Sequence, residues 1–189
     1  ADRVLVQEAI QGSVRDLVSF HGFVGRDGAL LASFCGRKLR TYPQFAGESA
    51  LIELAHDPDV DAFGRQVVER LGLRGPFKID LVRDPGSGVL RVLEVNARFT
   101  LWAELGAADG VNLLATAYDH LLTGQTLDAP GAPAPKHRWH SLGRDWRALA
   151  ERGGGVMSRL AWLHSLLETP LVHEIWDWRD PAPFAHAFA

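Results

Sequence analysis

Four polar residues that could bind a metal ion and phosphate groups lie within one short segment, Phe77–Arg98. The four are Lys78, Asp80, Glu94 and Asn96. Apolar, β-branched runs flank the turn-forming cluster Asp84–Gly88, which predicts a β-hairpin. Because side chains alternate between the two faces of a strand, the four polar residues share one face and the core takes the other. Carboxylate and amide oxygens are ligands that Mg2+ binds together with substrate phosphates, so the segment predicts a metal site.

The register of this hairpin follows from the length of its turn. We take Asp84–Gly88 as a five-residue loop. The expected pairs are then Arg83 with Val89, Asp80 with Val92 and Lys78 with Glu94. The alternative to a metal site is the solvated face of a half-buried hairpin, which often carries Lys, Asp and Glu. Asn96 favours the metal site, because Asn is disfavoured inside strands and here stands two residues after Glu94.

Two parts of the hairpin, Phe77–Asp80 and Leu93–Arg98, resemble the magnesium site of the ATP-grasp superfamily. They are most similar to carboxylate–amine ligases related to the large subunit of carbamoyl-phosphate synthase. Further segments that resemble this group are Val4–Gly12, Phe99–Trp102 and Gly110–Leu113. The resemblance covers roughly residues 3 to 124 and implies the C-terminal lobe of an ATP-grasp fold.

The resemblance implies a role for each polar residue of the hairpin. Asp80, Glu94 and Asn96 would bind the metal, and the implied cofactors are ATP and Mg2+ or Mn2+. Lys78 and Arg98 would be the catalytic cations that hold the acyl-phosphate or its tetrahedral intermediate. The alternative for Lys78 is a cross-strand ion pair with Glu94.

Nucleotide binding is implied for two further segments. Adenine would be held by Gln7, Glu8, Ala9 and Ile10, on a strand edge that offers backbone N–H and C=O groups. Asp16 is the candidate for the ribose hydroxyls. The alternative is an edge strand followed by a turn.

A basic cluster, Arg37, Lys38 and Arg40, precedes Tyr42-Pro43 and could neutralise phosphate or a substrate carboxylate. The alternative is a solvated charged loop. We expect an irregular segment over residues 36–47. Within it, the Arg37–Arg40 loop should be mobile or poorly packed until an anion binds, because like charges repel one another. His21 and Trp102 are expected near the same cleft, with a core position as the alternative for each.

The remaining pattern predicts an α+β fold, an antiparallel sheet with helices and a helical tail. We expect a strand at residues 3–10, a hairpin over 17–34, and a helix that begins after the N-cap Asp57 and ends at Gly72. A second helix is expected over 112–123, and two more around 145–152 and 156–168. The predicted domains are an ATP-grasp lobe at 1–124, a Pro/Ala-rich linker at 125–140 and a helical appendage at 141–189.

Composition limits the classes of function. The chain has 189 residues, a net charge of -3 and 47% hydrophobic residues, which suits a globular protein. Its mild acidity lacks the basic footprint of a nucleic-acid-binding protein. No apolar run is long enough to span a bilayer, so we expect no membrane partner. A single cysteine, Cys35, excludes an internal disulfide and fits a reducing, cytoplasmic location.

Together these features predict part of an ATP-dependent ligase that activates a carboxylate as an acyl-phosphate for attack by an amine or, less often, a thiol. The expected partners are small-molecule carboxylate and amine substrates, and homo-oligomer formation is left open. The chain starts abruptly without Met, and we expect an N-terminal lobe of the same protein to be missing, so that this chain alone does not ligate. The alternatives are a non-catalytic nucleotide- or partner-binding module and a metal-dependent phosphohydrolase.

Overall fold

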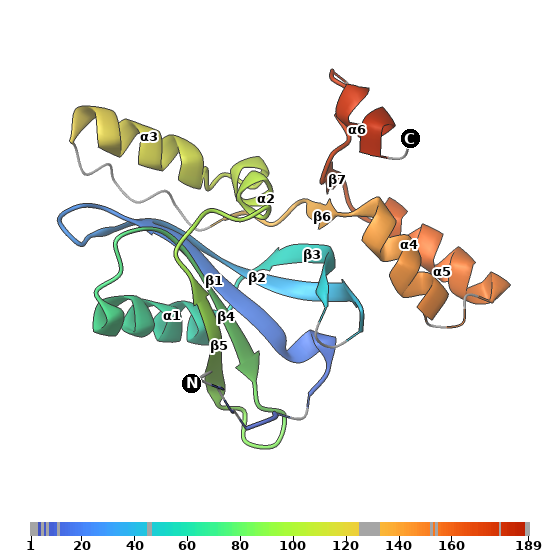
Figure 1. Cartoon of the computed structure of the whole chain (residues 1–189), viewed down its shortest axis with the longest axis horizontal. Coiled ribbons are helices and arrows are strands. Elements are labelled where there is room, and N and C mark those ends of the chain that lie inside the picture. Colours follow the sequence, from blue (N-terminus) through green and yellow to red (C-terminus); the bar gives the residue numbers. More distant parts are fainter. Residues whose placement is uncertain are drawn as a thin grey trace.

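The computed structural model describes residues 4, 6, 8–10, 12–44, 47–124, 133–151, 153, 155–177 and 179–187. Within these residues the chain forms a seven-stranded sheet in the order β5-β4-β1-β2-β3-β6-β7 (Figure 1). The strands are β1 (Leu17–Val24), β2 (Leu30–Tyr42), β3 (Glu48–Ala55), β4 (Gly75–Arg83), β5 (Leu90–Asn96), β6 (Arg138–His140) and β7 (Leu171–His173). All neighbours are antiparallel except β6 and β7, which are parallel. This mixed sheet with helices confirms the predicted α+β class.

Helices cover both faces of the sheet. They are α1 (Pro58–Leu71), α2 (Ala103–Ala108), α3 (Leu113–Thr123), α4 (Leu142–Glu151), α5 (Val156–Leu167) and α6 (Ala182–Ala187), with a short 3-10 helix, η1 (Val14–Asp16). Figure 1 shows α1 on one side of β1 and β2, and α2 and α3 on the other. Among the described residues, no helix has the length and apolar character needed to cross a membrane.

Helix α1 covers the face of the sheet that forms the first core. Its predicted caps are confirmed: the Asp57 side chain accepts a hydrogen bond from the Val60 N–H, and Gly72 ends the helix with a left-handed φ of 59°. Phe20 of β1 is fully buried under the helix. A Cβ on Gly64 would lie 2.3 Å from the Phe20 ring, so this glycine permits the close approach of helix and sheet.

The opposite face carries a second core beneath α2. Trp102, Phe34 and Ile52 are buried there together. A Cβ on Gly36 of β2 would lie 2.3 Å from the Trp102 ring, so a side chain at this position would displace the indole. The second core therefore holds Trp102 flat against the sheet, next to the polar part of the same face.

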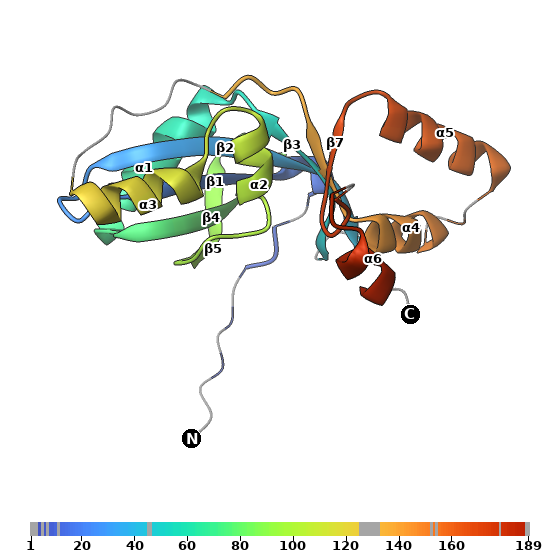
Figure 2. The same ribbon diagram turned by 90° about the horizontal axis from the view of Figure 1, so that it is seen from above.

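The C-terminal region adds the two strands β6 and β7 to the sheet. Strand β6 pairs with β3, with Leu51 opposite His140, although its residues fall within the predicted linker. Helix α4 contacts β2 and β3. Figure 2 shows α4, α5 and α6 grouped beyond the β3–β7 side of the sheet. Residues 125–132 lie outside the described part of the chain, and the domain limits at 124 and 140 stay predictions.

Two sequence-based expectations about strands are wrong. The described residues among positions 3–10 form no strand. The segment expected to be irregular is largely the second half of β2, which runs to Tyr42, followed by β3, which was not predicted. The reason is tertiary: β2 has hydrogen-bonding partners on both sides, β1 and β3, so a polar, basic sequence is held extended in the middle of the sheet.

Candidate functional site

The β4–β5 hairpin brings the predicted metal-binding residues onto one face, but in a different register. Asp80 lies opposite Glu94, and Lys78 lies opposite Asn96. Near the turn, Arg83 pairs with Leu90 instead of the predicted Val89, a slip of one residue.

A β-bulge between Asp80 and Leu81 adds a second slip. One slip alone would send a strand's side chains to the opposite face. The bulge restores the original parity, so the carboxylates converge although every predicted pair is wrong.

The contacts within this group are short and polar. The Lys78 ammonium Nζ lies 2.7 Å from Asp80 Oδ2, so Lys78 pairs with Asp80 and not with Glu94 as the alternative proposed. The Asn96 amide Nδ2 donates to Glu94 Oε1 at 2.9 Å. Burial raises the pKa of Asp80, and a hydrogen bond with Glu94 adds to this rise against the opposing effect of Lys78. Hydrogen bonds from Asn96 and then Asp80 lower the pKa of Glu94.

Two carboxyl groups in contact favour retention of one proton between them. A divalent cation between the two groups would replace that proton and satisfy both carboxylates. No group of three or more His, Cys, Asp and Glu side chains suited to a metal occurs in the described part of the chain. Mg2+ commonly needs only one or two carboxylates beside water and phosphate oxygens, so Asp80, Glu94 and Asn96 fit this ion. Their role as its ligands stays a prediction.

This polar group opens into a cavity of about 640 Å3. Its positively charged lining residues include Lys38 from β2, Lys78 from β4 and Arg98 after β5. Burial lowers the pKa of Lys38, while the nearby Asp80 carboxyl acts in the opposite direction. Trp102 and Trp139 form an apolar part of the cavity wall. Cations around an apolar-walled cavity with two carboxyl groups can hold a polyphosphate and a metal together.

A stack of aromatic rings lies next to Lys78 of the site. The His21 ring stacks between Phe34 and Trp102, with ring centroids 4.7 and 4.9 Å away. Lys78 Nζ lies 5.3 Å from the centroid of the Trp102 ring. Burial, followed by the charges of Lys78 and Lys38, lowers the pKa of His21 well below its ordinary value. A neutral His21 therefore adds no charge beside Lys78 and serves to position the Trp102 ring.

The remaining predicted nucleotide-binding residues are only partly brought to the cavity. Ile10 lines it, whereas the exposed Glu8 and Ala9 do not. Gln7 lies outside the described residues. The Asp16 carboxylate accepts hydrogen bonds from the N–H and hydroxyl of Ser13, at 2.7 and 2.8 Å. It caps η1 and does not line the cavity.

The basic cluster on β2 is divided between different partners. Only Lys38 lines the cavity. Arg37 pairs with Glu53. Arg40 binds Asp145 through Nε and Nη2, at 2.5 and 2.7 Å. The prediction of a loop is therefore wrong, since the three residues lie on β2, and both arginines are ion-paired within the protein because the strand distributes neighbouring side chains to different surroundings.

Sequence reasoning missed Glu48 and Arg144, which also line the cavity. Arg144 Nε lies 2.7 Å from Glu48 Oε2. The two residues belong to β3 and α4, and no local spacing connects them. Only the packing of α4 on the sheet reveals that they meet.

Comparisons with known proteins agree at the level of fold. No protein-family model matches the chain, and no curated protein does. The phosphoribosylaminoimidazole carboxylase ATPase subunit from Aquifex aeolicus is similar, with a TM-score of 0.51 and 13% identity over 65% of this chain and 38% of that one. N5-carboxyaminoimidazole synthetase from Staphylococcus aureus complexed with ADP has a TM-score of 0.52 and 15% identity over 68% of this chain and 35% of that one.

At such identities the likeness shows the fold alone. The chain has the fold of a part of these enzymes, which confirms the predicted resemblance to an ATP-grasp portion. It spans well under half the length of either neighbour.

Proposed function

We propose that this chain supplies the metal- and phosphate-binding wall of an ATP- and Mg2+-dependent ligase that joins a carboxylate to an amine. The observation that carries the proposal is the convergence of Asp80 and Glu94 beside Lys78 in a cation-lined cavity. The fold similarity to a synthetase complexed with ADP supports a nucleotide as the occupant.

The reaction transfers the γ-phosphate of ATP to the substrate carboxylate, and the amine then displaces phosphate. The attacking carboxylate and the phosphate repel each other, so the site must neutralise negative charge. Lys38, Lys78 and Arg98 do this by lining the cavity. Asp80, Glu94 and Asn96 would hold Mg2+, which supplies further neutralisation of the phosphates when bound.

No side-chain nucleophile is needed, because positioning and charge stabilisation carry such a reaction. The one cysteine agrees with this: burial, followed by Asp61 and Asp57, raises the pKa of Cys35 to about 12. Its thiol therefore stays protonated and unreactive at neutral pH.

We expect nucleotide binding without ligation from the isolated chain. One sheet supplies one wall of the cavity, and an ATP-grasp enzyme closes a second lobe over the nucleotide. Without that lobe, water reaches the phosphates and weakens the charge stabilisation on which the rate depends.

The test is calorimetric titration of the chain with ATP, with Mg2+ and with a chelator. Glu94→Gln keeps the size of the side chain and removes its charge, so Mg2+-dependent ATP binding should be lost. Glu69→Gln, at an exposed site on α1, is the matched control and should bind as the unaltered chain does. Equal binding with and without Mg2+, or no binding of ATP, would contradict the proposal.

A non-catalytic nucleotide-binding module is the second candidate. The small share of each neighbour that the chain covers favours it. Incubation with ATP, Mg2+, candidate carboxylates and hydroxylamine detects an acyl-phosphate, because hydroxylamine traps it as a hydroxamate. Hydroxamate formation would exclude the module and would also contradict the expectation that the isolated chain does not ligate. Without hydroxamate, ATP binding that depends on Mg2+ supports the ligase portion, and ATP binding that does not depend on Mg2+ supports the module.

A further inference from the structure

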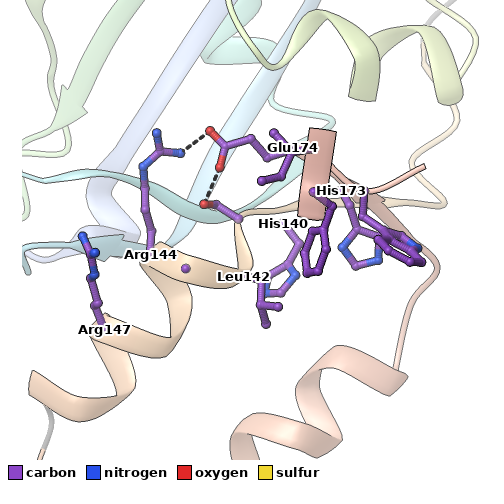
Figure 3. Close-up of a pocket in the computed structure, with 11 residues that line it drawn as sticks. His140, Leu142, Arg144, Arg147, His173 and Glu174 are labelled. Atoms are coloured by element: carbon purple, nitrogen blue, oxygen red, sulfur yellow. Dashed lines mark hydrogen bonds and ion pairs between the residues drawn. The ribbon is translucent and has the colours of Figure 1, made fainter. Parts of the chain in front are cut away.

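A second cavity, of about 380 Å3, lies outside the candidate site and is formed by β6, β7, α4 and the segment around α6. Figure 3 shows its lining side chains, with Arg144 and Arg147 on one side and His140 and His173 on the other. Arg144 is shared with the first cavity and forms part of the boundary between them.

The buried His140 imidazole lines this cavity and has one ring nitrogen without a hydrogen-bond partner among the described residues. The residue is 1% exposed, and its Nε2 lies 3.1 Å from Asp145 Oδ2. Burial alone would raise the pKa of Asp145, but hydrogen bonds from His140, Arg40 and Trp162 lower it. The ionised carboxylate holds the proton of the imidazole on Nε2.

The other ring nitrogen, Nδ1, remains for a hydrogen bond with a ligand. It is buried and has no hydrogen-bond partner among the described residues. A buried ring nitrogen without a partner is unfavourable, and a ligand hydroxyl, which can both donate and accept, would relieve this.

The walls of the cavity are largely apolar and aromatic. The Trp176 and Phe184 rings meet edge to face, with centroids 4.9 Å apart. Leu142 and Ile175 also line the cavity and remain 40% and 38% exposed. Flat aromatic surfaces next to partly exposed aliphatic side chains suit a ligand with an aromatic ring.

The charges of the cavity differ between its two sides. Glu174 already has partners for both carboxylate oxygens, because Oε1 lies 2.7 Å from Arg144 Nη1 and Oε2 accepts a hydrogen bond from the Ser141 hydroxyl. Arg147 is exposed and forms no ion pair with a carboxylate in the described part of the chain. Its guanidinium lies 6.0 Å from the Tyr42 ring centroid.

On the opposite side, burial and then His140 lower the pKa of His173, so that ring adds no positive charge. A negatively charged group is therefore favoured on the arginine side only.

We propose that this cavity binds a small aromatic carboxylate that spans it, with a hydroxyl hydrogen-bonded to His140 Nδ1 and the carboxylate paired with Arg147. The placement of Arg147 and His140 on opposite sides of the cavity requires these two groups at opposite ends of the ring. The proposal does not depend on the proposed ligase activity, because none of its recognition groups belongs to the metal-binding cluster.

The experiment is titration of the full chain with para-hydroxybenzoate, followed by calorimetry and by saturation-transfer NMR of the ligand. Benzoate lacks the hydroxyl, and para-hydroxybenzamide lacks the charge. Each should bind about tenfold more weakly or worse, since a lost charge-assisted or buried hydrogen bond has an effect of this size. Arg147→Gln should weaken para-hydroxybenzoate to the level of the amide, whereas Arg159→Gln, at an exposed site on α5, should leave binding unchanged.

Saturating ATP and Mg2+ should not displace the aromatic carboxylate, because the two cavities are separate. Displacement by ATP would assign the ligand to the first cavity and overturn the proposal. Equal binding of the acid and the amide, full affinity in Arg147→Gln, or no binding of any of the three probes would overturn it as well.

Discussion

Asp80 on strand β4 and Asp145 on helix α4 are both buried aspartates, but their partners differ. Asp145 receives hydrogen bonds from Arg40, Trp162 and His140, and these lower its pKa. Burial raises the pKa of Asp80, and the second carboxyl group beside it, Glu94, adds to the rise although Lys78 opposes it.

The difference teaches how to distinguish a structural carboxylate from one held ready for a ligand. A structural carboxylate is satisfied by the protein itself. A carboxylate that opens into a cavity beside another acid is costly until a cation arrives. The following predictions test this contrast, from the largest expected effect to the smallest.

Asp145→Asn should cause the largest loss of stability. The change leaves the Arg40 guanidinium, which is only 14% exposed, without its ionic partner. Removing one partner of a buried pair costs about 3–5 kcal/mol of unfolding free energy. Urea denaturation measures this loss, and Asp119→Asn on the exposed face of α3 should change stability by less than about 0.5 kcal/mol. Equal stability of the two variants would break the comparison.

Asp80→Asn should instead affect ligand binding more than folding. The change leaves Lys78 without its partner at 2.7 Å, but the charge of Lys78 also acts on the nearby Glu94, and burial disfavours the ionised form of Asp80. The loss of unfolding free energy should therefore be smaller than that of Asp145→Asn. Mg2+ with ATP should raise the melting temperature of the unaltered chain and not that of Asp80→Asn, because only the former binds the metal. A large destabilisation without ligand would show that Asp80 is structural.

The two aspartates should respond to pH in opposite directions. Because the pKa of Asp80 is raised in the folded protein, folded Asp80 keeps a proton that the unfolded chain releases. Asp80 therefore makes the stability of the protein fall as pH rises from the ordinary Asp pKa to the raised one. The lowered pKa of Asp145 means that its contribution is present above the ordinary pKa and is lost as pH falls through the lowered value. Asp80→Asn should remove the first dependence and keep the second, which denaturation across acidic pH can measure. Persistence of the first dependence in that variant would assign it to another group.

Arg37→Gln should have the smallest effect and sharpens the comparison on a single strand. Arg37 is 49% exposed and pairs with Glu53 at the surface, so its loss should cost less than about 1 kcal/mol. Arg40→Gln, two positions beyond Lys38 on the same strand, should cost clearly more because its partner Asp145 is fully buried. Denaturation curves of the two variants, measured together, give the contrast, and equal losses would contradict it.

Several features could be predicted from the sequence because they depend on neighbours along the chain. The caps and apolar stripe of α1 predicted its limits at Asp57 and Gly72. The two-residue period of strands predicted that Asp80, Glu94 and Asn96 share a face, and this holds although the turn is longer and a bulge intervenes. These residues still share a face because two single-residue shifts of the strand register cancel. Nothing in the sequence predicts either shift.

What tertiary structure alone decided is which distant groups meet. Arg37, Lys38 and Arg40 are equivalent as a sequence cluster. In the structure, however, Arg37 pairs with Glu53, Lys38 lines the first cavity and Arg40 pairs with Asp145. The second cavity depends on a parallel pairing of β6 with β7 and on α4, whose contacts no local period encodes. The physical reason is that a side chain's charge and burial depend on its partners in space. For Arg40 and His140, that partner is the same buried carboxylate.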